Sequence, residues 1–115
     1  GDRKIHDEFL QKRMFLHDLL WNMDYRAPRS FFNDVEFNQE FDDFLFKKVG
    51  YDNFRKATSG VFLTPYAATS LREYFATAFT EYYMDSNHKF LSKVAKTPFE
   101  KIISISKPNE LDSYY

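Results

Sequence analysis

The chain has 115 residues, enough for one small domain, and it contains no cysteine, which excludes disulfide bonds and thiolate metal sites. Sixteen basic and seventeen acidic residues give a net charge of -1, so the charge balance favours neither a nucleic acid nor an anionic membrane as a partner. Fourteen phenylalanines and eight tyrosines predict a core that is built from aromatic rings. No apolar segment reaches the roughly 20 residues that cross a bilayer, so we expect no membrane insertion.

Two helical regions are predicted in the first 50 residues. The first runs from Arg3 to Met23, because its apolar residues recur at spacings of three, four and seven. Pro28 closes this region, and Ser30 is the expected N-cap of a second region, in one or two pieces, that ends near Gly50. The apolar stripe of the second region consists of Phe37, Phe41, Phe44 and Leu45.

The second half of the chain is predicted to begin with a loop. Residues 51–65 include two turn-forming residues and the β-prone stretch GVFLT, so we expect a loop with room for one extended segment. A third helix should run from about Leu71 to Met84. The sequence TPFE at 97–100 combines an N-cap, a proline and a capping-box acid, and predicts a last short helix that ends before Pro108. We therefore expect a single domain over residues 1–106 and a C-terminal tail over residues 107–115.

Glu73 has two interpretations. Ser70 and Glu73 form the pattern S-x-x-E of a capping box, in which the acid also complements the positive end of the helix. Alternatively, Glu73 shares a face of short side chains with Ala76, Thr77 and Thr80, so that another helix could pack closely against its carboxylate. Such a carboxylate would need a partner such as Tyr66, His17 or Arg13, and it would be a good metal ligand if histidines came from the other helix.

A resemblance gives Tyr66 and Glu73 further roles. The segment LTPYAATSLREYFATAFTEYYMDSNHKFLSKVAKTPFEKIISI resembles the end of the anthrax lethal factor-like zincin metallopeptidase domain. In that family a tyrosine is followed seven residues later by a glutamate that opens an E-[FY]-F-A-x-A-F helix, and Tyr66 and Glu73 have this spacing. The resemblance implies the helical part of a zincin-like fold, with Glu73 as the third zinc ligand and Tyr66 as the group that stabilises the oxyanion.

The histidine motif of that family is missing. The alignment places H-E-x-x-H at Leu10 to Met14, where this chain reads LQKRM. The histidines of the chain are His6, His17 and His88, and no two are four residues apart, so no single helical turn can present two imidazoles to one metal. His6 and His17 are eleven residues apart and are predicted to belong to a solvated stripe of the first helix.

These observations predict a mainly α domain that is a degenerate copy of the metallopeptidase fold. We expect it to act as a protein-binding or structural module of a toxin or virion component, secreted or virion-associated, with a protein partner, without nucleic acid and without a cofactor. The alternative is that the chain is part of an active zinc metallopeptidase whose H-E-x-x-H helix lies outside this sequence. In that case zinc would be the cofactor, Glu73 would bind it, and Tyr66 would be catalytic.

Overall fold

The computed structural model describes the backbone of residues 2–112 and the side chains of residues 2–106. That part of the chain is mainly helical and contains no β-strand, which confirms the predicted α class. The elements are α1 (Asp2–Asn22), α2 (Arg29–Asn33), α3 (Gln39–Asp43), the π-helix η1 (Phe44–Gly50), α4 (Tyr51–Thr58), the 3-10 helix η2 (Pro65–Ala68), α5 (Leu71–Met84), α6 (Lys89–Val94) and α7 (Lys96–Asp112). None of these helices is both long and apolar enough to cross a membrane.

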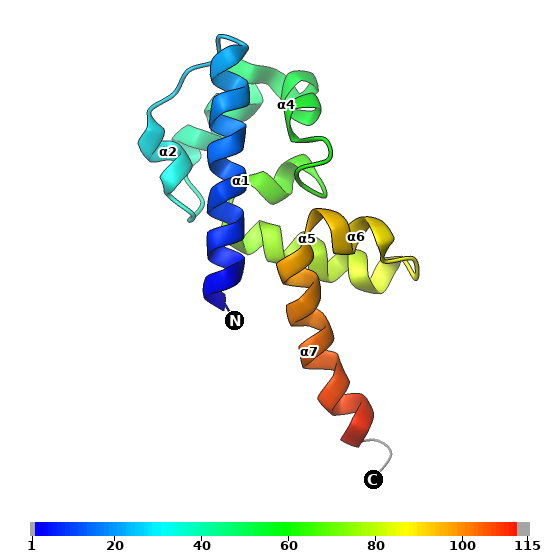
Figure 1. Ribbon diagram of the computed structural model, residues 1–115. Coiled ribbons are helices and arrows are strands. Elements are labelled where there is room, and N and C mark those ends of the chain that lie inside the picture. The colour runs from blue at the N-terminus through cyan, green and yellow to red at the C-terminus, as the bar shows by residue number, and fades with distance from the viewer. Residues whose placement is uncertain (1, 113–115) are drawn as a thin grey trace.

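Helix α1 is the axis around which the other helices are arranged (Figure 1). Helices α2 to α4 surround its C-terminal half, whereas α5 and α6 lie beside its N-terminal half, and α7 projects away from the body. The resulting shape is elongated, with extents of 57 × 25 × 20 Å. The buried face of α1 is a single stripe at spacings of three and four, made of Ile5, Phe9, Arg13, Leu16 and Leu20.

The C-terminus of α1 is closed by a turn rather than by Pro28. Asp24 adopts a left-handed conformation with φ of 68°. Its backbone N–H donates to the carbonyl of Trp21 at 3.0 Å, and the N–H of Tyr25 donates to the carbonyl of Leu20 at 2.8 Å. This pair of bonds is the Schellman pattern, which satisfies carbonyls that the helix end would otherwise leave without partners. The helix therefore stops several residues before the proline.

Arg13 is the buried charge at the centre of the fold. Its side chain is fully buried, and the guanidinium lies between the rings of Phe9 and Phe41, 4.8 and 4.5 Å from their centroids. It donates to five backbone carbonyls at 2.6 to 3.4 Å, those of Phe31, Phe32, Asp34, Ala68 and Thr69. Burial lowers the pKa of Arg13 to about 10, an effect that nearby Asp34 opposes, so the guanidinium remains charged at neutral pH.

The second helical region differs from the prediction in two respects. Helix α2 begins at Arg29, directly after Pro28, and no side chain caps it, so the expected N-cap at Ser30 is wrong. The physical reason is that the carbonyl of Pro28 already accepts a bond from the N–H of Phe31 at 3.0 Å. Phe37 does not belong to the buried stripe either, because it precedes α3 and is 59% exposed.

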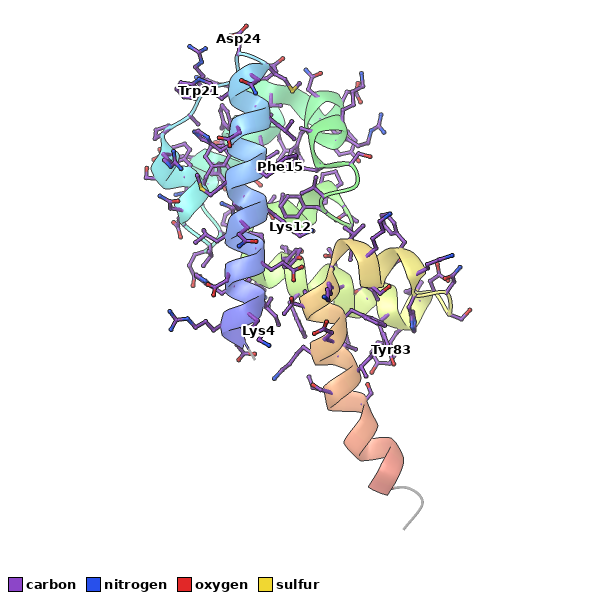
Figure 2. All side chains as sticks on the ribbon, viewed as in Figure 1. Lys4, Lys12, Phe15, Trp21, Asp24 and Tyr83 are labelled. Atoms are coloured by element: carbon purple, nitrogen blue, oxygen red, sulfur yellow. The ribbon has the colours of Figure 1, made fainter. Side chains whose placement is uncertain are left out.

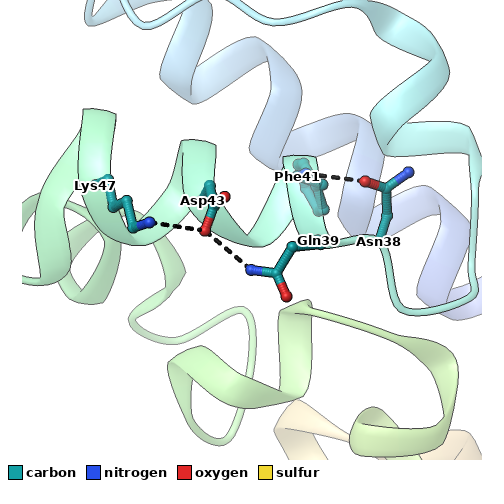
Figure 3. Close-up of polar contacts among 5 residues, drawn as sticks. All are labelled: Asn38, Gln39, Phe41, Asp43 and Lys47. Atoms are coloured by element: carbon teal, nitrogen blue, oxygen red, sulfur yellow. Dashed lines mark hydrogen bonds and ion pairs between the residues drawn. The ribbon is translucent and has the colours of Figure 1, made fainter.

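Asn38 is the actual N-cap of the next helix (Figure 3). Its side-chain oxygen accepts a bond from the N–H of Phe41 at 3.1 Å. Asp43 forms two contacts at the surface of these helices. One of its oxygens accepts a hydrogen bond from the side-chain amide of Gln39 at 2.9 Å and lies 3.4 Å from the ammonium of Lys47. This local cap places Phe41 and Phe44 in the core beside Phe32.

The loop expected over residues 51–65 is partly wrong, because α4 occupies Tyr51–Thr58. Its buried residues Phe54, Ala57 and Thr58 have the spacing of one helical face. Gly50 separates this helix from η1 with φ of 87°, a conformation that glycine adopts readily. The expected extended segment is limited to a single bridge between Ser59 and Phe62.

Helix α7 is longer than predicted. It begins at Lys96 and continues to Asp112, so the expected end before Pro108 is wrong. A proline inside a helix removes one backbone hydrogen bond and favours a kink, but it does not oblige the helix to end. The expected tail at 107–115 therefore includes helical backbone as far as Asp112, and residues 113–115 lie outside the described residues.

Replacing Arg13 by methionine should destabilise the fold by about 3 kcal/mol or more, because several buried carbonyls would lose their donor. Urea unfolding would measure this loss. Arg3→Met is the matched control, since Arg3 is exposed on the same helix, and it should change stability by no more than about 0.5 kcal/mol. A loss of unfolding free energy below about 1 kcal/mol for Arg13→Met would show that the guanidinium contributes little to the stability of the fold.

Candidate functional site

Tyr66 and Glu73 lie in two short capped segments that follow one another. Tyr66 is in η2, whose N-terminus is capped by the hydroxyl of Thr64 accepting from the N–H of Ala67 at 3.2 Å. Its side chain is exposed, and its ring lies 5.5 Å from that of Phe46. Glu73 is in the first turn of α5, where its backbone N–H donates to the hydroxyl of Ser70 at 3.1 Å. The predicted N-cap at Ser70 is therefore confirmed.

The partners expected for the carboxylate of Glu73 are engaged elsewhere. Within residues 2–106, no hydrogen bond or ion pair joins Glu73 to Tyr66, His17 or Arg13. Arg13 donates to backbone carbonyls, and His17 lies 3.0 Å from the carboxylate of Asp18. The contact expected with these partners is wrong, because Arg13 bonds to backbone carbonyls, His17 pairs with Asp18, and the ring of Tyr66 lies beside Phe46.

His17 is packed rather than solvated. Only 12% of its side chain is exposed, and its ring stacks on Trp21 with centroids 5.5 Å apart and meets Phe32 edge-on. The predicted solvated stripe of His6 and His17 is therefore wrong for His17, because aromatic neighbours cover it. Within the described residues, no group of three or more side chains of the metal-binding types lies close enough to hold an ion.

The outer face of α5 is not covered by any helix of the described chain. Ala76 and Thr80 are exposed, and Thr77 is half-buried with its hydroxyl donating to the carbonyl of Tyr74 at 3.0 Å. We expected another helix of this chain to pack closely on these short side chains, and that expectation is wrong. Glu73 is half-buried at the start of this open face.

The positions aligned with the histidine motif go once around α1, from the exposed Gln11 to the buried Arg13. Leu10 and Met14 are half-buried, and between them Arg13 is buried and Lys12 is partly buried. The structure thus places the half-buried Leu10 and Met14 and the exposed Gln11 where the family has its two histidines and its general base. The arrangement stabilises helix ends and has no means of binding a metal by itself.

A groove of about 690 Å³ opens near the start of α5, and sequence reasoning did not predict it. Its apolar part comes from four segments that are distant in sequence: Ile5, Val35, Phe37, Leu71, Phe75 and Ile105. Charged side chains of both signs lie around it, namely Asp2, Glu36, Arg72 and Lys101. The exposed Phe37 is thereby explained, since it lines this groove.

An aromatic strip continues from the groove along α5. Phe75, which lines the groove, is followed one turn later by Phe79 at a ring distance of 6.4 Å and then by Tyr83 at 4.9 Å. Phe79 is 43% exposed and Tyr83 is 62% exposed. Figure 2 shows Tyr83 on the outside of the molecule, away from α1. The i, i+4 spacing of these rings is visible in the sequence, but the exposure of Phe79 and Tyr83 is not.

Glu8 and Lys12 hold the second half of the chain against α1. The carboxylate of Glu8 accepts bonds from the hydroxyl of Tyr74 and, at 3.0 Å, from the backbone N–H of Thr97. The ammonium of Lys12 donates to the carbonyls of Val61 and Val94. Burial, with a smaller contribution from Glu8, raises the pKa of Tyr74 well above its usual value, and burial lowers the pKa of Lys12. Sequence reasoning missed these contacts.

Comparison of the chain with protein-family models, with curated proteins and with solved structures finds no match. The lethal factor-like resemblance, with its roles for Tyr66 and Glu73, therefore stays a prediction from the sequence.

The capping geometry predicts unequal effects at Ser70 and Glu73. Ser70→Ala should cost about 1 kcal/mol in urea unfolding, because it removes the acceptor of the first helical N–H groups. Glu73→Gln should be tolerated, and Glu73→Ala should cost at most about 1 kcal/mol, since only the interaction with the helix end is lost.

A double-mutant cycle of Glu73→Ala with Tyr66→Phe should be additive within about 0.5 kcal/mol, because no contact joins the two side chains. A coupling energy above about 1 kcal/mol would contradict this and would indicate an interaction between Tyr66 and Glu73 in solution.

Proposed function

We propose that this chain is a catalytically degenerate, metallopeptidase-like helical module that binds a protein partner. The observation that carries the proposal is the aromatic strip of Phe75, Phe79 and Tyr83, of which Phe79 and Tyr83 are exposed along α5 and the half-buried Phe75 lines the groove. Contiguous exposed apolar surface of this kind is typical of sites where another protein binds. Aromatic side chains are also enriched among the residues that contribute most to binding.

The chemistry of the surface favours a protein over other partners. The groove combines apolar side chains with both carboxylates and cations, and a protein surface can complement such a mixture. A nucleic acid would require a concentration of positive charge, whereas the chain has a net charge of -1. The lethal factor-like resemblance is what favours a secreted toxin or a virion component as the molecule that carries this module.

A second candidate function is supported by the environment of Glu73. Its carboxylate lies at the edge of a helix face that no other part of the described chain covers, beside the exposed Ala76. A helix with the motif H-E-x-x-H, located outside this sequence, could pack on that face and complete a zinc site with Glu73 as the third protein ligand. Tyr66 is exposed and free of side-chain hydrogen bonds within residues 2–106, as a catalytic hydroxyl would need to be.

A photo-crosslinking phenylalanine analogue at position 79, introduced in the native host, should give one discrete adduct with a protein partner. The same analogue at position 15 is the matched control, because Phe15 is 51% exposed on α1 and lies away from the strip (Figure 2). The adduct protein, identified by mass spectrometry and purified, should bind the recombinant chain directly. Phe79→Ser should weaken that binding at least tenfold, roughly 1.4 kcal/mol, whereas Phe15→Ser should not. Equal adducts at both positions, or equal affinities of both variants, would contradict the proposal.

Zinc binding distinguishes the two candidate functions when it is measured on the protein as its gene encodes it, because the second candidate takes its H-E-x-x-H helix from outside this sequence. For a degenerate module, one candidate ligand cannot replace the three that a catalytic zinc site needs, so that protein should retain no stoichiometric zinc after dialysis against a micromolar zinc solution, and peptide libraries should remain uncut. Elemental analysis would measure the metal, with Glu73→Gln as the matched variant. Stoichiometric zinc that is lost in Glu73→Gln, together with cleavage that a chelator abolishes, would favour the metallopeptidase instead.

A further inference from the structure

A connection of a single residue joins α6 to α7. Helix α6 ends at Val94 and α7 begins at Lys96, so that Ala95 is the one residue between them. Ala95 is fully buried and has φ of -125° and ψ of 60°, outside the helical region. The direction of α7 therefore depends on what holds the two helix ends that meet at this residue.

Two side chains of α1 hold those helix ends. Lys12 donates to the carbonyl of Val94, in the last turn of α6, and Glu8 accepts from the N–H of Thr97, in the first turn of α7. Carbonyls in the last turn and N–H groups in the first turn of a helix have no partners within the helix. Glu8 and Lys12 are four residues apart on α1 and therefore lie on the same face, one helical turn from each other.

The direction of α7 also shapes the groove. Lys101 and Ile105 of α7 line it, as do Glu36 and Phe37 from the segment between α2 and α3. Near the joint, α7 lies against α5 and α6, whereas its C-terminal half projects away from the body (Figure 1). A small change of angle at Ala95 would thus displace the groove wall.

We propose that Glu8 and Lys12 form a latch that fixes the angle between α6 and α7 and thereby sets the width of the groove. Glu8 is the central member, because its second oxygen accepts from the hydroxyl of Tyr74 and so joins α5, α7 and α1 at one carboxylate. Release of the latch frees α7 while the packing of α1 against α2 to α4 remains. An effect of the groove width on partner binding rests on the proposed function, whereas the effect of the latch on the angle between α6 and α7 does not.

Glu8→Gln tests the latch, because it removes the charge that strengthens both hydrogen bonds and leaves one oxygen where the carboxylate accepts from Tyr74 and Thr97 with two. Hydrogen exchange of the backbone amides in the first turns of α7 should accelerate by roughly fivefold or more, with the amides of α4 changing by less than about twofold. Asp7→Asn is the matched control, because Asp7 is the exposed neighbour and its side chain contacts His6 alone among the described residues. This control should leave exchange unchanged.

The absence of cysteine allows a direct measurement of the groove. Glu36→Cys and Ser104→Cys place one spin label at the groove and one on α7 beside the groove-lining Ile105, both at exposed positions. In the otherwise unchanged chain, the label-to-label distance should have one narrow distribution, which should broaden when Glu8→Gln is added. Lys12→Met should have the same effect on the distance, and it provides a second variant if Glu8→Gln does not fold.

The outcomes separate the latch from its alternatives. Exchange and distances in Glu8→Gln and Lys12→Met that match the unchanged chain would overturn the latch. Acceleration of exchange by the same factor in α4 and in α7 would also overturn it, because the carboxylate would then support the whole fold. Neither result would alter the crosslinking at position 79, so failure of the latch and failure of the proposed function are distinguishable.

Discussion

The fold depends on the buried guanidinium of Arg13. A charge placed in the core is costly unless its donors are satisfied, and here several carbonyls from two separate segments accept them. Those carbonyls lie at or just beyond the ends of α2 and η2, where helices leave acceptors without partners. The same hydrogen bonds therefore satisfy both the donors of the guanidinium and the carbonyls at the helix ends. The rings of Phe9 and Phe41 exclude water from this arrangement.

Other charged side chains of α1 also form hydrogen bonds with the backbone of distant segments. Glu8, Lys12 and Arg13 all point their charged groups at the backbone of other helices rather than at opposite charges. The exposed ion pairs of the molecule, such as that of Lys47 with Asp43, contribute little by comparison, since solvent screens them. The helices that surround α1 are short, and an isolated helix of five to eight residues has little stability in water. Side chains of α1 stabilise the ends of α2, η2 and α6 from outside.

Local patterns predicted much of the fold, and tertiary effects account for the rest. Helices α1 and α5 followed from apolar spacing, and the N-cap at Ser70 followed from residues only three apart. Helix α4 was missed although Phe54 and Ala57 have helical spacing, because the nearby glycines and the β-prone stretch suggested a loop. Arg13 has the stripe spacing of Phe9 and Leu16, but arginine side chains are rarely buried in full, so spacing alone does not predict its burial. Only the carbonyls of distant segments explain its burial.

The candidate site was less predictable than the fold. The spacing of Tyr66 and Glu73 is local, but the groove forms only when segments from four parts of the chain meet. Phe37 illustrates the difficulty, since an apolar residue near a helix is assigned to the core unless the surrounding surface is known. The contact between Glu8 and Thr97 spans 89 residues of sequence, and no periodicity encodes it.

The hydrogen bonds of Arg13 also constrain how the chain can fold. Its acceptors are 18 to 21 residues away in one segment and 55 to 56 residues away in the other. Loop closure over such separations loses chain entropy before any bond forms, and a half-closed state would bury the charge with only some of its acceptors. Partly ordered states are therefore less stable than the unfolded chain and less stable than the folded protein. A small helical protein of this kind should consequently fold with the cooperativity, and the slower rate, of a topology richer in distant contacts.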